Sequence, residues 1–200
     1  MPGALLLDFD GVLVQTQEAW LNTMNAVAQQ RGTPPIDRAH FLETWGQSVE
    51  ADAALFFQGA NPAEIGRQYT DVFAEFVGLV RIEPHAKHLF DSCRQSGLPT
   101  AIVTNAPLEL VDTLAHHFGL KPIAMCAPSK GVGPKPAPDL LIKACDKTGV
   151  DCCKAWFVGD TSNDRAAAKA ACTHFVGYGT PGDSRISTLA ELIDQLFHGQ

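Results

Sequence analysis

Residues 5–13, Leu-Leu-Leu-Asp-Phe-Asp-Gly-Val-Leu, place two acids at a spacing that suits metal-assisted chemistry. The uncharged leucines predict a short buried strand. Because alternate residues of an extended chain face the same way, Asp8 and Asp10 would point into one site at the strand's carboxyl end, where Gly11 allows a turn. Their charges repel by about a kcal/mol or more, so an oxygen-bound divalent cation, most simply Mg²⁺, would fit between them. For this motif alone, a strand-end turn with solvated acids is the alternative.

Other polar residues follow later apolar runs. Thr104 and Asn105 come after the apolar run Ala101-Ile-Val of one predicted strand, and Asp160 and Asp164 follow another strand. Lys135 lies between them among three prolines, which restrict the backbone and reduce the entropic cost of presenting its amine. Each has a plainer interpretation: a turn for the first pair, a helix cap for the acids and a solvated lysine. In open parallel sheets, however, ligands bind at the carboxyl ends of strands. Together, these groups therefore predict a site for a phosphoryl group beside a metal.

The elements that must position these residues fall into two kinds. From residue 84 onward, strand and helix patterns alternate, which predicts an α/β fold with a parallel sheet covered on both faces. Residues 15–81 show almost no strand-like alternation and read as helices, so this block is interpreted as an insertion after the first strand. The expected helices are 18–30, 38–44, 48–57, 62–78, 84–95, 108–117, 138–147, 164–171 and 188–197, and the expected strands after the first are 99–105, 122–126, 155–158 and 174–177.

Composition narrows the class of protein. A chain of 200 residues with 46% hydrophobic composition suits one domain, or one domain carrying an insertion. The net charge of −7 argues against nucleic acid or an anionic membrane surface as the main partner. The sequence shows neither a spanning apolar run nor a signal peptide, and its six cysteines form no C-x-x-C pair. These features predict a cytoplasmic protein with free thiols, and they leave its oligomeric state open.

Taken in order, four segments resemble the motifs of the haloacid dehalogenase superfamily, most closely its phosphoglycolate-phosphatase and β-phosphoglucomutase-like branch. The resemblance spans the whole chain. It implies a Rossmann-like parallel sheet core at 1–14 and 82–200, with an all-helical cap inserted at 15–81. The segments that carry it are Asp8-Phe-Asp10-Gly-Val-Leu, Thr104-Asn105, Lys135-Pro-Ala-Pro-Asp and Gly159-Asp160-Thr-x-x-Asp164.

The resemblance also implies roles for the acids. Asp8 would attack phosphorus to form an aspartyl-phosphate, and Asp10 would act first as acid and then as base. Mg²⁺ would be held by Asp8, the backbone carbonyl of Asp10, and Asp160, with Asp164 in direct contact or behind them. The implied enzyme is a Mg²⁺-dependent phosphatase that acts on a small phosphorylated metabolite such as a sugar phosphate or phosphoglycolate.

Phosphate contacts are implied by the same resemblance. Thr104 and Lys135 would bind the oxygens of the transferring group, and backbone N–H groups near Phe9 and Asn105 would complete the cradle. Mg²⁺ and one lysine would cancel enough charge for a carboxylate to approach a phosphoryl anion.

Departures from the mutase members bear on the reaction. Where mutases carry a histidine ten positions after the acid–base residue, this chain has Trp20, and the turn around Trp45 offers no arginine. Without cationic cap groups, a bisphosphorylated intermediate would be poorly held, so hydrolysis is favoured over transfer within the substrate. Trp20, Gln47 and Ser48 are candidate substrate contacts in the cap, although core packing would also explain Trp20 and Trp45. Two non-enzymatic classes stay open as well: a phospho-aspartate signalling domain and a binding protein on an inactive scaffold.

Overall fold

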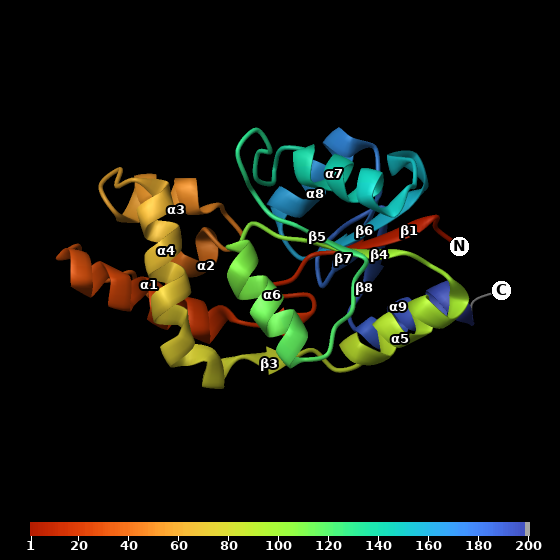
Figure 1. The fold of residues 1–200 in the computed structure, drawn as a ribbon, viewed down its shortest axis with the longest axis horizontal. Coiled ribbons are helices and arrows are strands. Elements are labelled where there is room, and N and C mark those ends of the chain that lie inside the picture. Colours follow the sequence, from red (N-terminus) through yellow and green to blue (C-terminus); the bar gives the residue numbers. More distant parts are fainter. Residues whose placement is uncertain (199–200) are drawn as a thin grey trace.

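A six-stranded sheet forms the centre of the computed structural model, which describes residues 1–198 (Figure 1). Every strand pairs in parallel with its neighbour, in the order β5-β4-β1-β6-β7-β8. The predicted α/β fold with a parallel sheet is thereby confirmed. The strands are β1 (Ala4–Leu7), β4 (Thr100–Val103), β5 (Ala124–Cys126), β6 (Ala155–Gly159), β7 (His174–Tyr178) and β8 (Ser184–Ile186).

Helices cover both faces of the sheet, as Figure 1 shows. Helices α7 (Asp139–Thr148) and α8 (Ser162–Ala171) lie on one face, and α5 (Ala86–Ser96) and α9 (Leu189–Phe197) lie on the other. Helix α6 (Leu108–His117) contributes to the same core as α5 and α9, and a short 3₁₀ turn, η2 (Cys152–Lys154), precedes β6.

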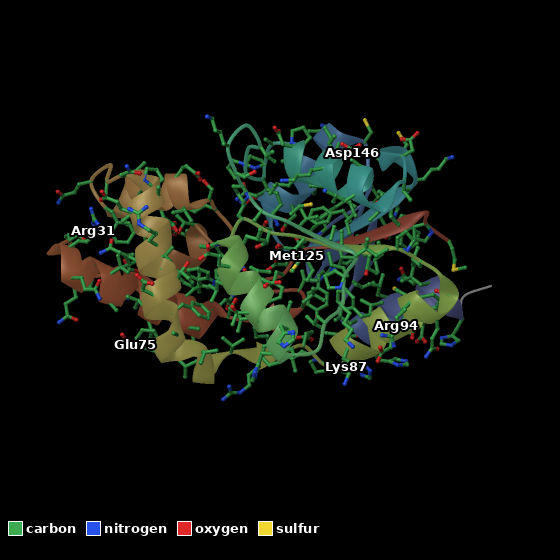
Figure 2. The ribbon with its side chains drawn as sticks, viewed as in Figure 1. Arg31, Glu75, Lys87, Arg94, Met125 and Asp146 are labelled. Atoms are coloured by element: carbon green, nitrogen blue, oxygen red, sulfur yellow. The ribbon has the colours of Figure 1, made fainter. Side chains whose placement is uncertain are left out.

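The central strand β1 belongs to two cores at once. Leu5 and Leu7 pack into the core under α5 and α9, whereas Leu6 packs into the core under α7 and α8. A strand buried on both faces needs an uninterrupted apolar run, which explains the three leucines. In Figure 2, by contrast, the labelled Lys87 and Asp146 lie on the outer sides of α5 and α7, where both residues are exposed.

A group of helices lies beyond one end of the sheet (Figure 1). Three of these helices begin with a side-chain cap, from Asp37, Ser48 and Asn61, and Pro62 occupies the first turn of the last one, as predicted. The group comprises α1 (Gln17–Arg31), α2 (Arg38–Glu43), α3 (Val49–Phe56), α4 (Pro62–Phe73) and the 3₁₀ helix η1 (Ala74–Leu79). The expected single helix over 62–78 is therefore divided in two.

Two short strands join this helical group to the sheet. Strand β2 (Val14–Gln15) pairs antiparallel with β3 (Arg81–Ile82). The segment that leaves the sheet for the helical group therefore lies beside the segment that returns from it. Glu83 accepts hydrogen bonds from the Gln15 amide at 2.8 Å and the Tyr178 hydroxyl at 2.6 Å, which tie the crossings to β7. We propose that the cap spans 15–81, with 1–14 and 82–200 forming the core; residues 199–200 of that range lie outside the described residues.

Sequence patterns located most of the elements but missed β2, β3 and β8. These strands have two or three residues, which is too short to display an alternating pattern. None of the helices in residues 1–198 has the length and apolar character needed to cross a membrane.

Replacing Leu6 with Ala tests the two-core architecture. Leu6 is completely buried in β1, so Leu6→Ala should lower the free energy of unfolding by about 2–5 kcal/mol because it leaves a cavity. Ile142→Ala, at a site on α7 that is 45% exposed, should change it by less than about 0.5 kcal/mol. Urea denaturation of both variants measures the difference. Equal losses would contradict the assigned core.

Candidate active site

Three carboxylates meet at the carboxyl edge of the sheet. Asp8 follows β1, Asp160 follows β6, and Asp164 lies in the first turn of α8. Each offers an oxygen within 4.8 Å of the others, and Asp8 and Asp164 are buried. Residues separated by some 150 positions meet because parallel strands end at a common edge.

Lys135 supplies the positive charge of the cluster. Its Nζ lies 2.7 Å from Asp8 Oδ1 and 2.7 Å from Asp164 Oδ1, and it donates to the Val103 carbonyl at 3.1 Å. Burial opposes a charged amine, but Asp164 and Asp8 outweigh it and hold the pKa of Lys135 above its usual value. Burial and Asp164 raise the pKa of Asp8, while Lys135 opposes the rise. With its acids ionised, the cluster would still carry more negative than positive charge.

An unpartnered oxygen marks where a cation fits. Asp160 Oδ1 is buried and accepts no hydrogen bond from the described residues, whereas its Oδ2 accepts one from Trp45 Nε1 at 3.2 Å. Burial, with a further contribution from Asp164, raises the pKa of Asp160 to about 7. Buried carboxylate oxygens rarely lack a partner. An oxygen ligand set with excess negative charge is what Mg²⁺ prefers, so these residues fit that ion.

Gly11 leaves the space that this cluster needs. Its φ of +85° lies in the left-handed region, and a Cβ at this position would stand 2.3 Å from Asp160 Oδ2. Both the turn and the approach of the Asp160 carboxylate therefore require glycine after the two acids of the opening motif.

Asp10 is held by two donors from the start of the helical group. Its Oδ1 accepts from Thr16 Oγ1 at 2.5 Å and from Trp20 Nε1 at 2.9 Å. Burial raises the pKa of Asp10, and these two bonds partly offset the rise. Trp20 also packs against Tyr69 and Phe73, so it combines core packing with a contact to a candidate catalytic residue. Sequence reasoning gave Thr16 no role.

The side chain of Asn105 positions Lys135. Its Oδ1 accepts from the Lys135 N–H at 2.8 Å, and its Nδ2 donates to the Lys135 carbonyl at 2.9 Å. The predicted phosphate contact of Asn105 would therefore come from its backbone. Thr104 lies beside it, 1% exposed, with its Oγ1 accepting from the Ala106 N–H at 3.0 Å.

A loop of the helical group lies against this edge of the sheet. The Gly46 carbonyl accepts from Asn105 Nδ2 at 3.0 Å and from Asn163 Nδ2 at 3.2 Å. A Cβ on Gly46, whose φ is +81°, would meet the Thr161 side chain at 2.7 Å. With Trp45 bonded to Asp160, these contacts close the cap loop over the acids.

The cap and the core together line a partly open cavity of about 70 Å³. The core contributes Asp8, Asp10, Thr104, Asn105, Ala106, Pro107 and Lys135, and the cap contributes Trp20, Met24, Phe41, Thr44, Trp45, Gly46, Gln47, Val49, Asp52 and Tyr69. Of the proposed cap contacts, Trp20 and Gln47 line the cavity. The Ser48 hydroxyl caps α3 by accepting from the Ala51 N–H at 3.3 Å, and Ser48 is not among the described lining residues.

Asp52 and Tyr69 line the cavity without having been singled out in the sequence. Asp52 Oδ1 accepts from Gln47 Nε2 at 2.6 Å, and its Oδ2 accepts from the Tyr69 hydroxyl at 3.0 Å. Burial raises the pKa of Asp52 to about 6. The one signal in the sequence was an acid amid the apolar residues of α3, Val-Glu-Ala-Asp-Ala-Ala-Leu-Phe, which a solvated helix face explains equally well.

Fold and site together define an α/β enzyme with a helical cap, whose acids and lysine meet at the sheet edge. The sequence model of the haloacid dehalogenase-like hydrolases matches residues 5–178, and the chain belongs to this family. It is an enzyme of the phosphatase type, and its relatives of known name include phosphoglycolate phosphatases.

Relatives of known name match over nearly the whole chain. A phosphoglycolate phosphatase of Xanthomonas campestris is 28% identical, and the match covers 96% of this chain and 91% of the relative. An N-acetylmuramic acid 6-phosphate phosphatase of Pseudomonas aeruginosa is 24% identical, with coverage of 95% and 89%. Among solved structures, CbbY from Rhodobacter sphaeroides in complex with phosphate has a TM-score of 0.84 at 23% identity, with 96% of each chain covered. β-Phosphoglucomutase from Clostridium difficile has a TM-score of 0.85 at 15% identity, with 99% of this chain and 96% of that one covered. The structural likenesses support the fold.

Replacing Asp52 with Asn tests whether its buried charge destabilises the protein. The pKa of Asp52 rises from 3.8 to about 6 on folding, so the folded protein binds the proton more tightly and loses stability as the pH rises through this interval. The free energy of unfolding of Asp52→Asn, taken relative to wild type, should therefore increase by about 2–3 kcal/mol as the pH rises from about 4 to about 7.5. Urea unfolding at both pH values measures the gain.

Asp71→Asn, which changes an exposed carboxylate on α4, is the matched control and should change the free energy of unfolding by less than about 0.5 kcal/mol because its side chain is at the surface. A difference between Asp52→Asn and wild type that stays constant with pH would contradict the destabilising role of the charge.

Proposed function

We propose that this enzyme is a Mg²⁺-dependent phosphatase that hydrolyses a small phosphomonoester through an aspartyl-phosphate on Asp8. The observation that carries the proposal is the Lys135 ammonium between Asp8 and Asp164, beside the unpartnered oxygen of Asp160. A phosphoryl group placed there would meet a nucleophile, a fixed positive charge and a cation site together. The phosphatase names of the relatives support this assignment.

Mg²⁺ would be held by Asp8, the backbone carbonyl of Asp10, and Asp160, with Asp164 in direct contact or behind them. When bound, the ion would supply the positive charge that lets an anionic phosphoryl group approach a carboxylate. The acid cluster, with its excess negative charge and its unpartnered oxygen, supports this ligand set.

Asp8 would act first, with an oxygen attacking phosphorus. Its Oδ1 is engaged by the Phe9 N–H at 2.7 Å and by Lys135, so Oδ2 is the oxygen outside these bonds. As the new bond forms, the bond from phosphorus to the ester oxygen breaks, and the Asp10 carboxyl gives its proton to the leaving oxygen.

Water would complete the reaction. The Asp10 carboxylate takes a proton from a water molecule, whose oxygen attacks phosphorus and displaces Asp8. Inorganic phosphate leaves, and both acids return to their starting states. The bonds from Thr16 and Trp20 fix the Asp10 carboxylate for these two transfers and hold one of its oxygens in place.

The transferring oxygens would be bound by Lys135, the Thr104 hydroxyl and backbone N–H groups near Phe9 and Asn105. Asn105 contributes indirectly as well, because its two bonds to the Lys135 backbone fix where the lysine begins. The cap loop that lies over the acids would exclude bulk water during the reaction.

Hydrolysis is favoured over phosphoryl transfer within the substrate. A mutase of the β-phosphoglucomutase type must hold a second phosphate, yet the described cap residues that line the cavity include no lysine, arginine or histidine. Trp20 donates to Asp10 where those enzymes carry a histidine. Membership of the hydrolase family favours an enzyme over a signalling domain.

Asp8→Asn tests the nucleophile. An amide cannot form the acyl-phosphate, so turnover of para-nitrophenyl phosphate should fall by at least about 10³-fold, and wild-type turnover should stop on chelation of Mg²⁺ and return on its addition. Release of para-nitrophenol measures both. Metal-independent turnover, or an active Asp8→Asn variant, would refute the proposal.

Asp10→Asn tests the acid–base role separately. With an aryl phosphate, the leaving group needs little protonation, so the first step should survive while hydrolysis of the intermediate slows about 10²–10⁴-fold. The variant should release a burst of para-nitrophenol and retain one phosphoryl group, which intact-protein mass spectrometry detects. Slow turnover with neither a burst nor a phosphorylated protein would count against this role.

A further inference from the structure

A buried carboxylate faces the cavity from the cap. Asp52 on α3 is 8% exposed, and its two oxygens accept from the Gln47 amide and the Tyr69 hydroxyl. A carboxylate offers about four acceptor positions, so these two bonds leave capacity for donors on a bound molecule. Neither partner carries a positive charge, and burying such a group costs stability that a neutral side chain would not cost.

The charges around the cavity are divided between its two ends. At the core end, Lys135 is the one cation among the described lining residues, and it is paired with Asp8 and Asp164. At the cap end, Asp52 is the charged group. Its pKa of about 6 leaves it ionised at neutral pH. A substrate whose phosphate lies at Asp8 would therefore present the rest of its structure to a negative charge with no counter-ion nearby.

We propose that Asp52 is a specificity residue that favours phosphomonoesters whose other end carries a hydroxyl or amino group and disfavours those that carry a carboxylate. The inference rests on the proposed phosphatase function and narrows its substrate class. A hydroxyl or ammonium would donate to a free acceptor position of Asp52. A carboxylate would meet the like charge of Asp52, which is itself buried, and repulsion is strong where a charge is removed from water.

The other cap side chains fit the same class of molecule. Gln47 and Thr44 supply polar contacts, and Trp20, Phe41 and Tyr69 supply apolar walls for the carbon-bound hydrogens of a short polyol. Phosphoglycolate, the compound in the name of the Xanthomonas campestris relative, carries a carboxylate at this end. We therefore expect this chain to prefer a different compound.

A matched pair of substrates isolates this effect. Hydroxyethyl phosphate differs from phosphoglycolate only in having a CH₂OH group in place of the carboxylate, and aminoethyl phosphate adds a positive charge. At neutral pH with Mg²⁺, wild-type kcat/KM should be at least about tenfold higher for hydroxyethyl phosphate than for phosphoglycolate, and aminoethyl phosphate should also exceed phosphoglycolate.

Variants then assign the preference to Asp52. In the nearly isosteric Asp52→Asn, the ratio of kcat/KM for hydroxyethyl phosphate to kcat/KM for phosphoglycolate should fall by about tenfold, chiefly because kcat/KM for phosphoglycolate rises. Turnover of para-nitrophenyl phosphate, which carries neither the hydroxyl nor the carboxylate, reports any general damage to the enzyme. Asp71→Asn, an exposed acid on α4, should leave the ratio as in wild type. The wild-type ratio tests the inference even if Asp52→Asn does not fold.

The outcomes separate the two proposals. A wild-type enzyme that turns over para-nitrophenyl phosphate but prefers phosphoglycolate, or treats the pair equally, would overturn the role of Asp52 and leave the phosphatase function intact. An unchanged ratio in a folded Asp52→Asn variant would do the same. Failure of the wild type to hydrolyse any of these esters with Mg²⁺ would refute the phosphatase function itself.

Discussion

The ion pair that joins Lys135 to Asp8 and Asp164 is the interaction on which the site depends. It holds together carboxylates that would otherwise repel one another in a buried place, and it leaves negative charge for a cation. Much of the nearby structure serves to keep this lysine in position. Asn105 bonds to its backbone on both sides, and the Val103 carbonyl accepts from its amine. A lysine this well fixed can meet a phosphoryl group with little loss of side-chain entropy.

The cap loop connects the carboxyl edge of the sheet to the proposed substrate contacts. Trp45 reaches Asp160, and the Gly46 carbonyl accepts from two asparagines of the core, so the cap loop touches the candidate metal ligands directly. The same loop carries Gln47, which bonds to Asp52. The buried charge of Asp52 is expected to lower the free energy of unfolding at neutral pH, and recognition of a substrate donor would explain its presence. The proposed catalytic and recognition groups thus line the same cavity.

Much of the core could be predicted because its signals are local. The leucines of β1, the alternation of strands and helices after residue 84, and the acids that follow β1 and β6 are visible in short windows of sequence. The rule that parallel strands end at one edge then places distant residues together. The roles of individual cap residues were harder to predict. Asp52, Tyr69 and Thr16 occupy positions that a helix surface or a turn would explain, so no local pattern distinguished them.

By itself, the sequence determined the fold class, the family and the set of acids and lysine at the sheet edge, because spacing, periodicity and motif order are written along the chain. Only the tertiary structure decided which way the cap side chains face. Trp20 packs and also donates to Asp10, Ser48 caps a helix, and Asp52 points into the cavity. The physical reason is that the sequence of a helix contains the residues of all its faces and does not mark which face is buried. Which side is buried depends on what packs against it.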